Sequence, residues 1–278
     1  MTLAFTSRPS LVAYLTCGDP DLRTTRDVAL AAISAGAEVL ELGVPFSDPV
    51  ADGPVIKRAS ERALRNGTSL EQVLKLAEEI RRESNAGLII FSYLNPALRI
   101  GLEDFAAKAA DAGIDGALIT DLPVEEAGEY LRSMRKRNLA TVFLAAPTST
   151  DERLKRIAEA STGFVYAVSR TGVTGAQKEL PQDAQKLVQR LRKFTKLPIA
   201  VGFGISAPEQ FASVGKYADA AVVGSAIVQL IERSPCKEAP AVAEFVKQLS
   251  AVSSQPSANT GLHTAGMAGS DLGGRYDF

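Results

Sequence analysis

The stretch Ala37–Pro54 reads AEVLELGVPFSDPVADGP and joins a strand pattern to an acidic loop. Val39–Leu42 has the aliphatic residues of a strand that is covered on both faces, as in parallel sheets. Glu41 interrupts this apolar run near its end, and Asp48 and Asp52 follow in a loop that also holds two Gly and three Pro. Spacing alone leaves open a structural role for Asp48 and Asp52, as caps of a turn and a helix.

Similar short apolar runs recur along the chain, with amphipathic helical patterns between them. One such helix is expected over Leu70–Arg82, after the potential N-cap residues Thr68 and Ser69, and another begins at Pro208. Eightfold alternation of strand and helix predicts a single (β/α)8 barrel of the TIM class, with an open doubly wound sheet as the alternative. The eight expected strands are Leu11–Leu15, Val39–Leu42, Leu88–Ser92, Gly116–Thr120, Thr141–Ala145, Phe164–Val168, Ile199–Val201 and Ala221–Val223.

One domain accounts for most of the 278 residues, because barrels of this class occupy about 250 residues. We assign residues 1–249 to the barrel. Residues 250–278 form a Gly-, Ser- and Ala-rich, low-complexity tail that is expected to be disordered, since it has too few apolar residues to bury. Within the barrel, Glu41 is expected at the C-terminal rim of the second strand, where such folds hold their active sites.

The composition excludes several classes of protein. The 31 basic and 32 acidic residues leave a formal charge of −1 with no long run of one sign, which argues against a nucleic-acid partner. No apolar stretch is long enough to span a bilayer, and no secretory signal pattern is present. We therefore expect a cytoplasmic protein, or a stromal one in an organelle.

Cysteine and histidine usage narrows the possible chemistry. Cys17 and Cys236 form no C-x-x-C pair and are both expected to be reduced. The single histidine, His263, lies in the tail, which removes an imidazole base and histidine metal sites from consideration. Acid–base chemistry must then come from carboxylates, tyrosines or lysines, and no metal site is expected.

The acidic loop also has a family resemblance. Glu41–Pro54 resembles the signature of tryptophan synthase alpha subunits, and further motifs follow in the family's order over residues 11–233. The resemblance implies a carbon–carbon lyase of tryptophan biosynthesis that cleaves indole-3-glycerol phosphate into indole and glyceraldehyde-3-phosphate. The further motifs are Thr16–Pro20 (TCGDP), Tyr93–Pro96 (YLNP), Asp121–Glu126 (DLPVEE), Ser169–Ala176 (SRTGVTGA), Gly202–Ser206 (GFGIS) and Val223–Val228 (VGSAIV).

The resemblance assigns roles to three side chains in this retro-aldol reaction. It implies that Glu41 is the acid–base group and that Asp52 accepts the indole N–H and stabilises positive charge on the protonated ring. It places the hydroxyl of Tyr166 near the glycerol and Glu41. A buried strand tyrosine with one hydrogen bond is the alternative for Tyr166.

Glycines after the last two strands predict a phosphate site. Gly204, Gly224 and Ser225 stand where a barrel offers backbone N–H groups to a phosphate, although simple turn chemistry is the alternative. By resemblance, Gly175 joins them from the sixth loop. Arg170 and Thr174 of that loop are expected to close over the ligand as a lid. The alternative is that the loop serves only as a flexible connector.

An indole slot is expected among apolar residues of the barrel. The resemblance points to Tyr14, Ile56, Phe91, Leu118 and Phe203, whereas composition alone predicts that such residues pack in the core. Tyr14 stands where bacterial relatives are expected to have phenylalanine, so its hydroxyl is expected at the rim of the slot.

The family resemblance also implies a partner. The expected partner is a pyridoxal-phosphate-dependent beta subunit in an alpha2beta2 heterotetramer, and the chain itself is expected to need no cofactor. Pro45, Phe46 and Asp48 are the candidates for partner contact, against an alternative of ordinary loop packing. Three other functions remain open: a stand-alone lyase that releases free indole, a non-catalytic activator of the beta subunit, and a different phosphate-binding barrel.

The chain departs from the family pattern at both ends. The family usually has an extra helix before the first strand, which covers the bottom of the barrel, yet only Met1–Pro9 precede that strand. The tail after Leu249 also has no counterpart in the family pattern. We expect the barrel to lack the extra helix and the chemistry to be unaffected, since the bottom lies opposite the active site.

Overall fold

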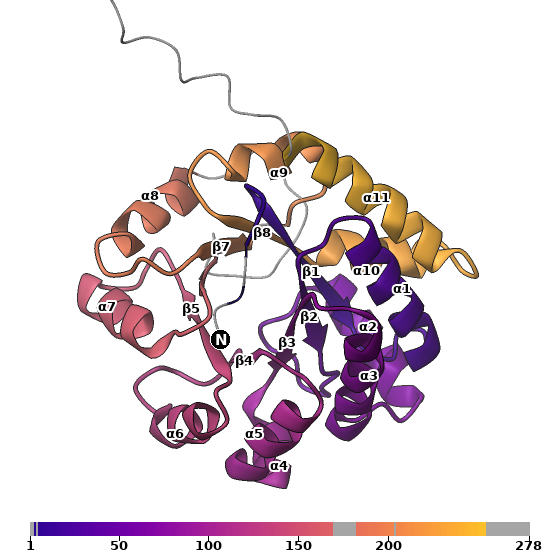
Figure 1. The fold of residues 1–278 in the computed structure, drawn as a ribbon, viewed down its shortest axis with the longest axis horizontal. Helices are drawn as coiled ribbons and strands as arrows, with labels where there is room; N and C mark the ends of the chain where they lie inside the picture. The colour runs from indigo at the N-terminus through magenta and orange to yellow at the C-terminus, as the bar shows by residue number, and fades with distance from the viewer. Residues whose placement is uncertain (1–2, 4, 169–181, 203, 254–278) are drawn as a thin grey trace, which may run out of the picture.

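A closed barrel of eight parallel strands forms the centre of the molecule (Figure 1). The computed structural model describes residues 3, 5–168, 182–202 and 204–253. The strands are β1 (Ser10–Thr16), β2 (Val39–Gly43), β3 (Gly87–Ser92), β4 (Gly116–Ile119), β5 (Ala140–Ala145), β6 (Val165–Val168), β7 (Ile199–Gly202) and β8 (Ala220–Val223).

The sheet closes because β8 pairs with β1. The two strands run parallel in a register from Ser10↔Ala220 to Ala13↔Val223. All the remaining pairings join strands that follow one another in the sequence. The predicted barrel is thus confirmed, and the open-sheet alternative is wrong. Each of the eight predicted strands overlaps an observed one.

Helices form the outer layer of the barrel (Figure 1). The predicted helix over Leu70–Arg82 is confirmed as α3, in which the Gln72 side chain accepts a hydrogen bond of 2.9 Å from the N–H of Ser69. The predicted start at Pro208 is confirmed as the start of α9. The helices are α1 (Leu22–Ser34), α2 (Pro54–Arg65), α3 (Leu70–Glu83), α4 (Leu94–Ile100), α5 (Leu102–Asp111), α6 (Gly128–Lys136), α7 (Asp151–Ala160), α8 (Gln182–Leu191), α9 (Pro208–Val214), α10 (Ser225–Arg233) and α11 (Glu238–Ser253).

Side chains alternate along each strand between an outer and an inner apolar layer, since successive residues of a strand point to opposite faces. On β1, Leu11, Ala13 and Leu15 pack with the helices in the outer layer. Val12 belongs to the inner layer that fills the barrel. The other buried strand residues of that inner layer are Val39, Ile89, Leu118, Val142, Ala200, Ala220 and Val222.

The segment before β1 covers the bottom of the barrel. Leu3 is buried in the inner apolar layer, and Phe5 packs against the same layer with its ring 5.7 Å from that of Phe164, edge to face. No helix precedes β1 among residues 3 and 5–9, as expected. Leu3 and Phe5 therefore cover the bottom of the barrel, where the expected extra helix is missing.

Glu38 anchors this N-terminal segment at the start of β2. Its carboxylate accepts hydrogen bonds from the backbone N–H and the hydroxyl of both Thr6 and Ser7. Burial alone would raise the pKa of Glu38, but these hydrogen bonds outweigh it and lower the pKa. The segment is thus held by charge-assisted hydrogen bonds as well as by apolar contact.

The last described helix, α11, packs along α1, α9 and α10. Val242, Val246 and Leu249 of this helix are fully buried. The helix continues to Ser253, so the domain boundary expected at Leu249 falls within it. The tail expected to be disordered lies outside the described residues from 254 onward.

None of the helices in the described part of the chain has both the length and the apolar character needed to cross a membrane.

Shortening Leu3 tests the cover at the bottom of the barrel. Leu3→Ala should lower the free energy of unfolding by about 2 kcal/mol, the lower end for a buried leucine, because it removes apolar contacts and leaves a cavity. The same change at Leu98, whose side chain is 50% exposed on α4, should cost less than ~0.5 kcal/mol. Urea unfolding measures both, and equal losses would contradict the role of Leu3.

Candidate active site

The inner face of β1 and β2 is polar at its C-terminal end. On β2, Val39, Glu41 and Gly43 share the face that points into the barrel, because they alternate with the outward Leu40 and Leu42. Glu41 is fully buried and stands in register with Tyr14 of β1. The structure thus places the predicted strand-end carboxyl inside the barrel, near the rim where active sites of this fold lie.

Glu41 is buried without a hydrogen-bonding partner among the described residues. Neither of its carboxylate oxygens has one there. Burial raises the pKa of Glu41 from its usual 4.5 to about 8, because removal from water disfavours the charged form. A neutral carboxylic acid at physiological pH is the consequence, and such a group can donate a proton.

Asp52 lies in the loop after β2 and is 8% exposed. The hydroxyl of Tyr93 donates a hydrogen bond of 3.2 Å to Oδ2 of Asp52 and accepts one of 3.0 Å from the N–H of Ala51. Burial raises the pKa of Asp52, the Tyr93 hydrogen bond and the charge of Lys57 lower it, and the net value is about 6. Between pH 6 and pH 8, Asp52 is therefore ionised while Glu41 is neutral.

Tyr93 is a site residue that the sequence analysis did not single out. It follows β3, and its ring stacks on that of Phe46 with centroids 5.0 Å apart and planes at 25°. Its one sequence signal is its position at the start of the motif Tyr93–Pro96, directly after a strand. Together, the Phe46 contact and the Asp52 hydrogen bond hold the acidic loop against the end of β3.

Two tyrosines, the buried Tyr14 and the partly buried Tyr166, lie near the carboxyl groups. Burial raises the pKa of Tyr166 well above its usual value, and the charges of Glu41 and then Asp52 raise it further. Burial and the charge of Asp52 act in the same way on the pKa of Tyr14. Both tyrosines therefore stay protonated and lie close enough to the carboxyl groups to sense their charge.

Glycines make room for the two hydroxyl groups. A Cβ atom at Gly43 would collide with the hydroxyl of Tyr14, and a Cβ atom at Gly202 would collide with that of Tyr166. Glycine at the ends of β2 and β7 thus lets each tyrosine ring approach the backbone of the neighbouring strand closely. Neither glycine was identified as part of the site from the sequence.

The residues predicted to form the apolar slot lie in two adjoining clusters. Tyr14 and Ile56 pack with Ala59 and Val228, and Phe91 contacts this cluster with its ring 5.1 Å from that of Tyr14. Leu118 belongs to the inner barrel layer, against which Phe91 and Tyr166 also pack. Phe203, the remaining residue predicted for the slot, lies outside the described residues.

The predicted phosphate-binding glycines follow β7 and β8. Gly204 has φ +55°, a left-handed conformation that favours glycine. Gly224 is the N-cap of α10, and Ser225 is the first residue of that helix, which has no side-chain cap. A Cβ atom at Gly224 would lie 3.3 Å from the Cβ of Tyr14, so this helix end adjoins the site. Gly175 and the lid candidates Arg170 and Thr174 lie outside the described residues.

The middle of the acidic loop faces solvent, whereas its two ends are buried. Of the residues predicted to contact a partner, Asp48 is exposed, Phe46 is half-buried against Tyr93, and Pro45 is buried. Val50, at 78% exposed, is the most exposed large apolar side chain of the described residues. Sequence reasoning did not select Val50.

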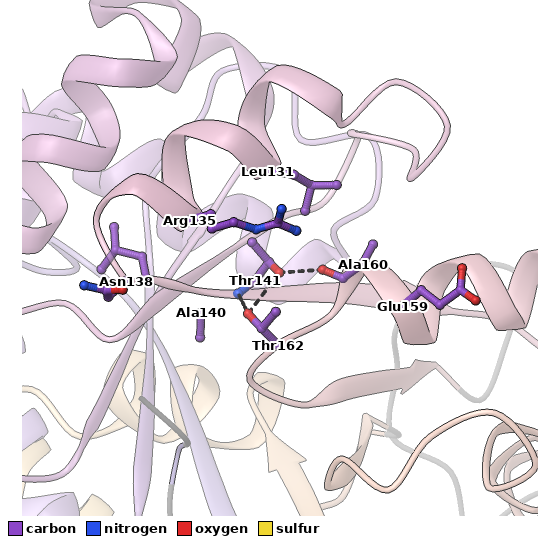
Figure 2. A pocket seen from close by; sticks show the side chains of 9 residues that line it. Leu131, Arg135, Asn138, Ala140, Thr141, Glu159, Ala160 and Thr162 are labelled. Atoms are coloured by element: carbon purple, nitrogen blue, oxygen red, sulfur yellow. Dashed lines mark hydrogen bonds between the residues drawn. The ribbon is translucent and has the colours of Figure 1, made fainter.

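Other features of the described residues lie apart from this site. They contain no group of three His, Cys, Asp or Glu side chains placed to hold a metal ion. A surface hollow of about 280 Å³ lies between α6, α7 and the start of β5, at the opposite rim from Glu41 (Figure 2). There, the hydroxyl of Thr141 donates a hydrogen bond of 2.6 Å to the carbonyl of Ala160. The backbone N–H of Thr141 donates one of 2.9 Å to the hydroxyl of Thr162. The polar groups of Thr141 are thus satisfied within the protein.

The buried Glu41 makes stability depend on pH in a testable way. Since its pKa is higher in the folded than in the unfolded chain, the native state holds the extra proton between pH 4.5 and about 8, and the free energy of unfolding falls as pH rises through this range. Glu41→Gln should remove this dependence and be more stable than the wild type by at least ~1 kcal/mol above pH 8.

Glu38→Gln is the matched control for this measurement. Because folding lowers the pKa of Glu38, its carboxylate stabilises the fold above the usual pKa of 4.5, and the variant should be less stable than the wild type at neutral pH. Urea unfolding across the pH range compares the three proteins. A Glu41→Gln variant that is destabilised equally at every pH would contradict the buried acid.

Comparison with known proteins agrees with this geometry. The family model described as tryptophan synthase alpha chain matches residues 2–257. The tryptophan synthase alpha chain of Solibacter usitatus is 55% identical over 228 residues, which cover 82% of this chain and 85% of that protein. That of Geotalea daltonii is 46% identical over 236 residues, with 85% and 89% covered.

Solved structures agree in fold as well as in sequence. A structure of Mycobacterium tuberculosis tryptophan synthase matches with a TM-score of 0.83 and 37% identity, covering 90% of this chain and 94% of that one. A tryptophan synthase complex from Pyrococcus furiosus matches with a TM-score of 0.82 and 40% identity, covering 88% and 99%. The family model, the similar sequences and the eight-stranded barrel all point to one family. The chain belongs to the tryptophan synthase alpha chain family.

Proposed function

We propose that this chain cleaves indole-3-glycerol phosphate into indole and glyceraldehyde-3-phosphate, with Glu41 as the group that gives and takes the protons. This is the lyase reaction of the tryptophan synthase alpha chain family. The observation that carries the assignment of Glu41 is its complete burial at the end of β2, with a pKa raised to about 8. The chain has one histidine, at position 263, so a carboxyl group is the natural proton carrier.

One side chain is sufficient for both proton transfers. Below pH 8 Glu41 is protonated and donates its proton to C3 of the indole ring. The resulting carboxylate accepts the proton of the adjacent side-chain hydroxyl as the carbon–carbon bond breaks. The bonding electrons return to the ring, the hydroxyl carbon becomes the aldehyde of glyceraldehyde-3-phosphate, and Glu41 is protonated again.

Asp52 supplies the negative charge that this mechanism needs. Its pKa of about 6 leaves it ionised while Glu41 is still protonated. Tyr93 bonds Oδ2, so Oδ1 remains to accept the indole N–H and to stabilise the positive charge that protonation places on the ring. We assign Tyr93 as the residue that orients Asp52, and Tyr166 as a hydroxyl beside Glu41 and the glycerol.

The remaining predicted residues fit the two ends of the substrate. Tyr14, Ile56, Phe91 and Leu118 would enclose the indole ring, with Phe203 as a further wall. The backbone N–H groups at Gly204 and at the start of α10 would bind the phosphate, since a helix N-terminus favours an anion. Gly175, Arg170 and Thr174 stay predictions for the sixth loop.

A beta subunit completes the reaction sequence in this proposal. The Pyrococcus furiosus relative was solved as a tryptophan synthase complex, and for this chain we propose an alpha2beta2 assembly, with pyridoxal phosphate in the beta subunit only. The exposed Asp48 and Val50 are the side chains of the acidic loop best placed for contact, while the buried Pro45 would set the course of the loop. As an amino-acid biosynthetic enzyme, the protein would act in the cytoplasm.

The assignment of Glu41 is tested by its amide. Glu41→Gln should lower kcat by at least ~10²-fold with little change in KM, because it removes a proton-transfer group and keeps its shape. Wild-type kcat/KM should peak between pH 6 and pH 8, where Asp52 is ionised and Glu41 protonated. Glu38→Gln, at the other end of β2, should keep full activity. Indole release measures all three, and more than a tenth of wild-type turnover in Glu41→Gln would exclude Glu41.

A methyl group at Gly224 tests the phosphate site. Gly224→Ala places a Cβ 3.3 Å from Tyr14 at the start of α10, so the dissociation constant of glycerol 3-phosphate should rise ~10-fold or more, about 1.4 kcal/mol. Gly128→Ala is the matched control, since its Cβ would meet only the flexible end of Arg132. Calorimetric titration compares them, and equal affinities would place the phosphate elsewhere.

A further inference from the structure

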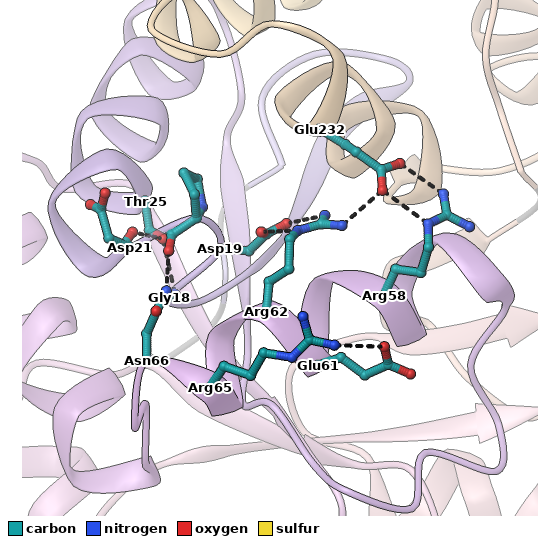
Figure 3. Close-up of polar contacts among 11 residues, drawn as sticks. Gly18, Asp19, Asp21, Thr25, Arg58, Glu61, Arg62, Arg65, Asn66 and Glu232 are labelled. Carbon is teal, nitrogen blue, oxygen red and sulfur yellow. Dashed lines mark hydrogen bonds and ion pairs between the residues drawn. The ribbon is translucent and has the colours of Figure 1, made fainter.

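An ion cluster joins the segment after β1, helix α2 and helix α10 (Figure 3). Arg62 of α2 bonds both oxygens of Asp19, after β1, at 2.7 and 2.9 Å, and bonds Glu232 of α10 at 2.7 Å. Arg58 bonds Glu232 at 2.9 and 2.7 Å. We name Asp19, Arg58, Arg62 and Glu232 the α2–α10 clamp.

The geometry of the clamp depends on the guanidinium of Arg62. Its planar fork bonds both oxygens of Asp19 while a third N–H group reaches Glu232, a geometry that the ammonium of a lysine does not reproduce. Asp19 is only 2% exposed, whereas the Glu232 side chain is 26% exposed. Loss of Arg62 would leave Asp19 buried without its partner, while loss of the Glu232 charge would leave the Asp19–Arg62 pair intact.

The two clamped helices both begin at the active site. Helix α2 starts at Pro54, directly after the segment with Asp52, and α10 starts at Ser225. Near these starts the helices pack through Ile56 and Val228. Arg62 lies about 9 Å further along α2 than Ile56, and Glu232 lies about 6 Å further along α10 than Val228, at 1.5 Å per residue.

Two attachments restrain a pair of helices better than one. The apolar contact between Ile56 and Val228 is non-directional, so it does not by itself set the angle between the two helices. The clamp adds directional, charge-assisted hydrogen bonds at a second point, which restrict that angle. The distance between Asp52 and the start of α10 is then set for a ligand that touches both.

We propose that Arg62 and Glu232 are positioning residues that hold the two ends of the site at the separation the whole substrate requires. The inference rests on the proposed function, in which the indole ring lies at Asp52 and the phosphate at Ser225. A ligand that spans both ends depends on their separation, whereas a ligand at one end does not. The clamp should therefore affect turnover of the whole substrate far more than binding of its phosphate half.

A surface ion pair on the same helix provides a matched control. Glu61 pairs with Arg65 at 3.9 Å, and both side chains are largely exposed (Figure 3). Such pairs contribute little and connect no second element. Glu61→Gln removes the same charge as Glu232→Gln and leaves every hydrogen bond of the clamp in place.

The test measures three quantities on each variant: kcat for indole-3-glycerol phosphate, the dissociation constant of glycerol 3-phosphate, and the melting temperature. Glu232→Gln should lower kcat about tenfold, bind glycerol 3-phosphate within about twofold of the wild type and melt at nearly the same temperature. Arg62→Lys should lose turnover in the same way, because it keeps the charge and loses the fork. Glu61→Gln should match the wild type in all three.

The pH profile separates the clamp from the acid–base groups. Hydrogen bonds from Arg58 are the largest cause that holds the pKa of Glu232 at about 2, so the clamp stays charged across the neutral range. Glu232→Gln should therefore reduce kcat/KM by one factor throughout, with the limbs of the profile unmoved.

Two results would overturn the inference. One is a Glu232→Gln variant with kcat within about twofold of the wild type; the other is an equal loss in turnover and in glycerol 3-phosphate affinity, which marks general loosening. Failure of the proposed function would look different, since the wild-type chain itself would then release no indole.

Discussion

The hydrogen bonds between β1 and β8 are the interaction on which the rest of this structure depends. They close the sheet, so every second residue of each strand points into an interior that water cannot reach. Lower in the barrel these positions are filled by apolar side chains such as Val39. At the C-terminal rim the same alternation brings Glu41 inside, next to Tyr14. Closure therefore creates both the core and the reactive carboxyl group.

Burial of Glu41 has a thermodynamic cost that is also the basis of its chemistry. Glu41 is removed from water and has no hydrogen-bonding partner among the residues that the structure describes, so it resists ionisation, which raises its pKa to about 8 and reduces stability at higher pH. Asp52 is less deeply buried and receives a hydrogen bond from Tyr93, so its pKa stops at about 6. Two similar carboxyl groups thereby take different charge states at one pH, as an acid and an anion must.

The two rims of the barrel are stabilised by different means. At the bottom, Leu3 and Phe5 fill the opening and Glu38 fixes the segment that carries them. At the top, glycines at positions 43 and 202 admit tyrosine hydroxyls, and the clamp through Arg62 ties α2 to α10. Apolar packing together with the hydrogen bonds of Glu38 gives stability at the bottom, and directional hydrogen bonds set geometry at the top, where a ligand is expected.

The sequence by itself determined the eight strands, the capped helix α3 and the positions of Glu41 and Asp52, because hydrophobic periodicity and residue type are local properties. Only the tertiary structure decided that Tyr93 bonds Asp52, 41 residues away, and that Arg62 bonds Glu232, 170 residues away. Such pairs depend on which strands become neighbours when the barrel closes. Local patterns do not contain that information. The same holds for the raised pKa of Glu41, which arises from burial inside the closed barrel.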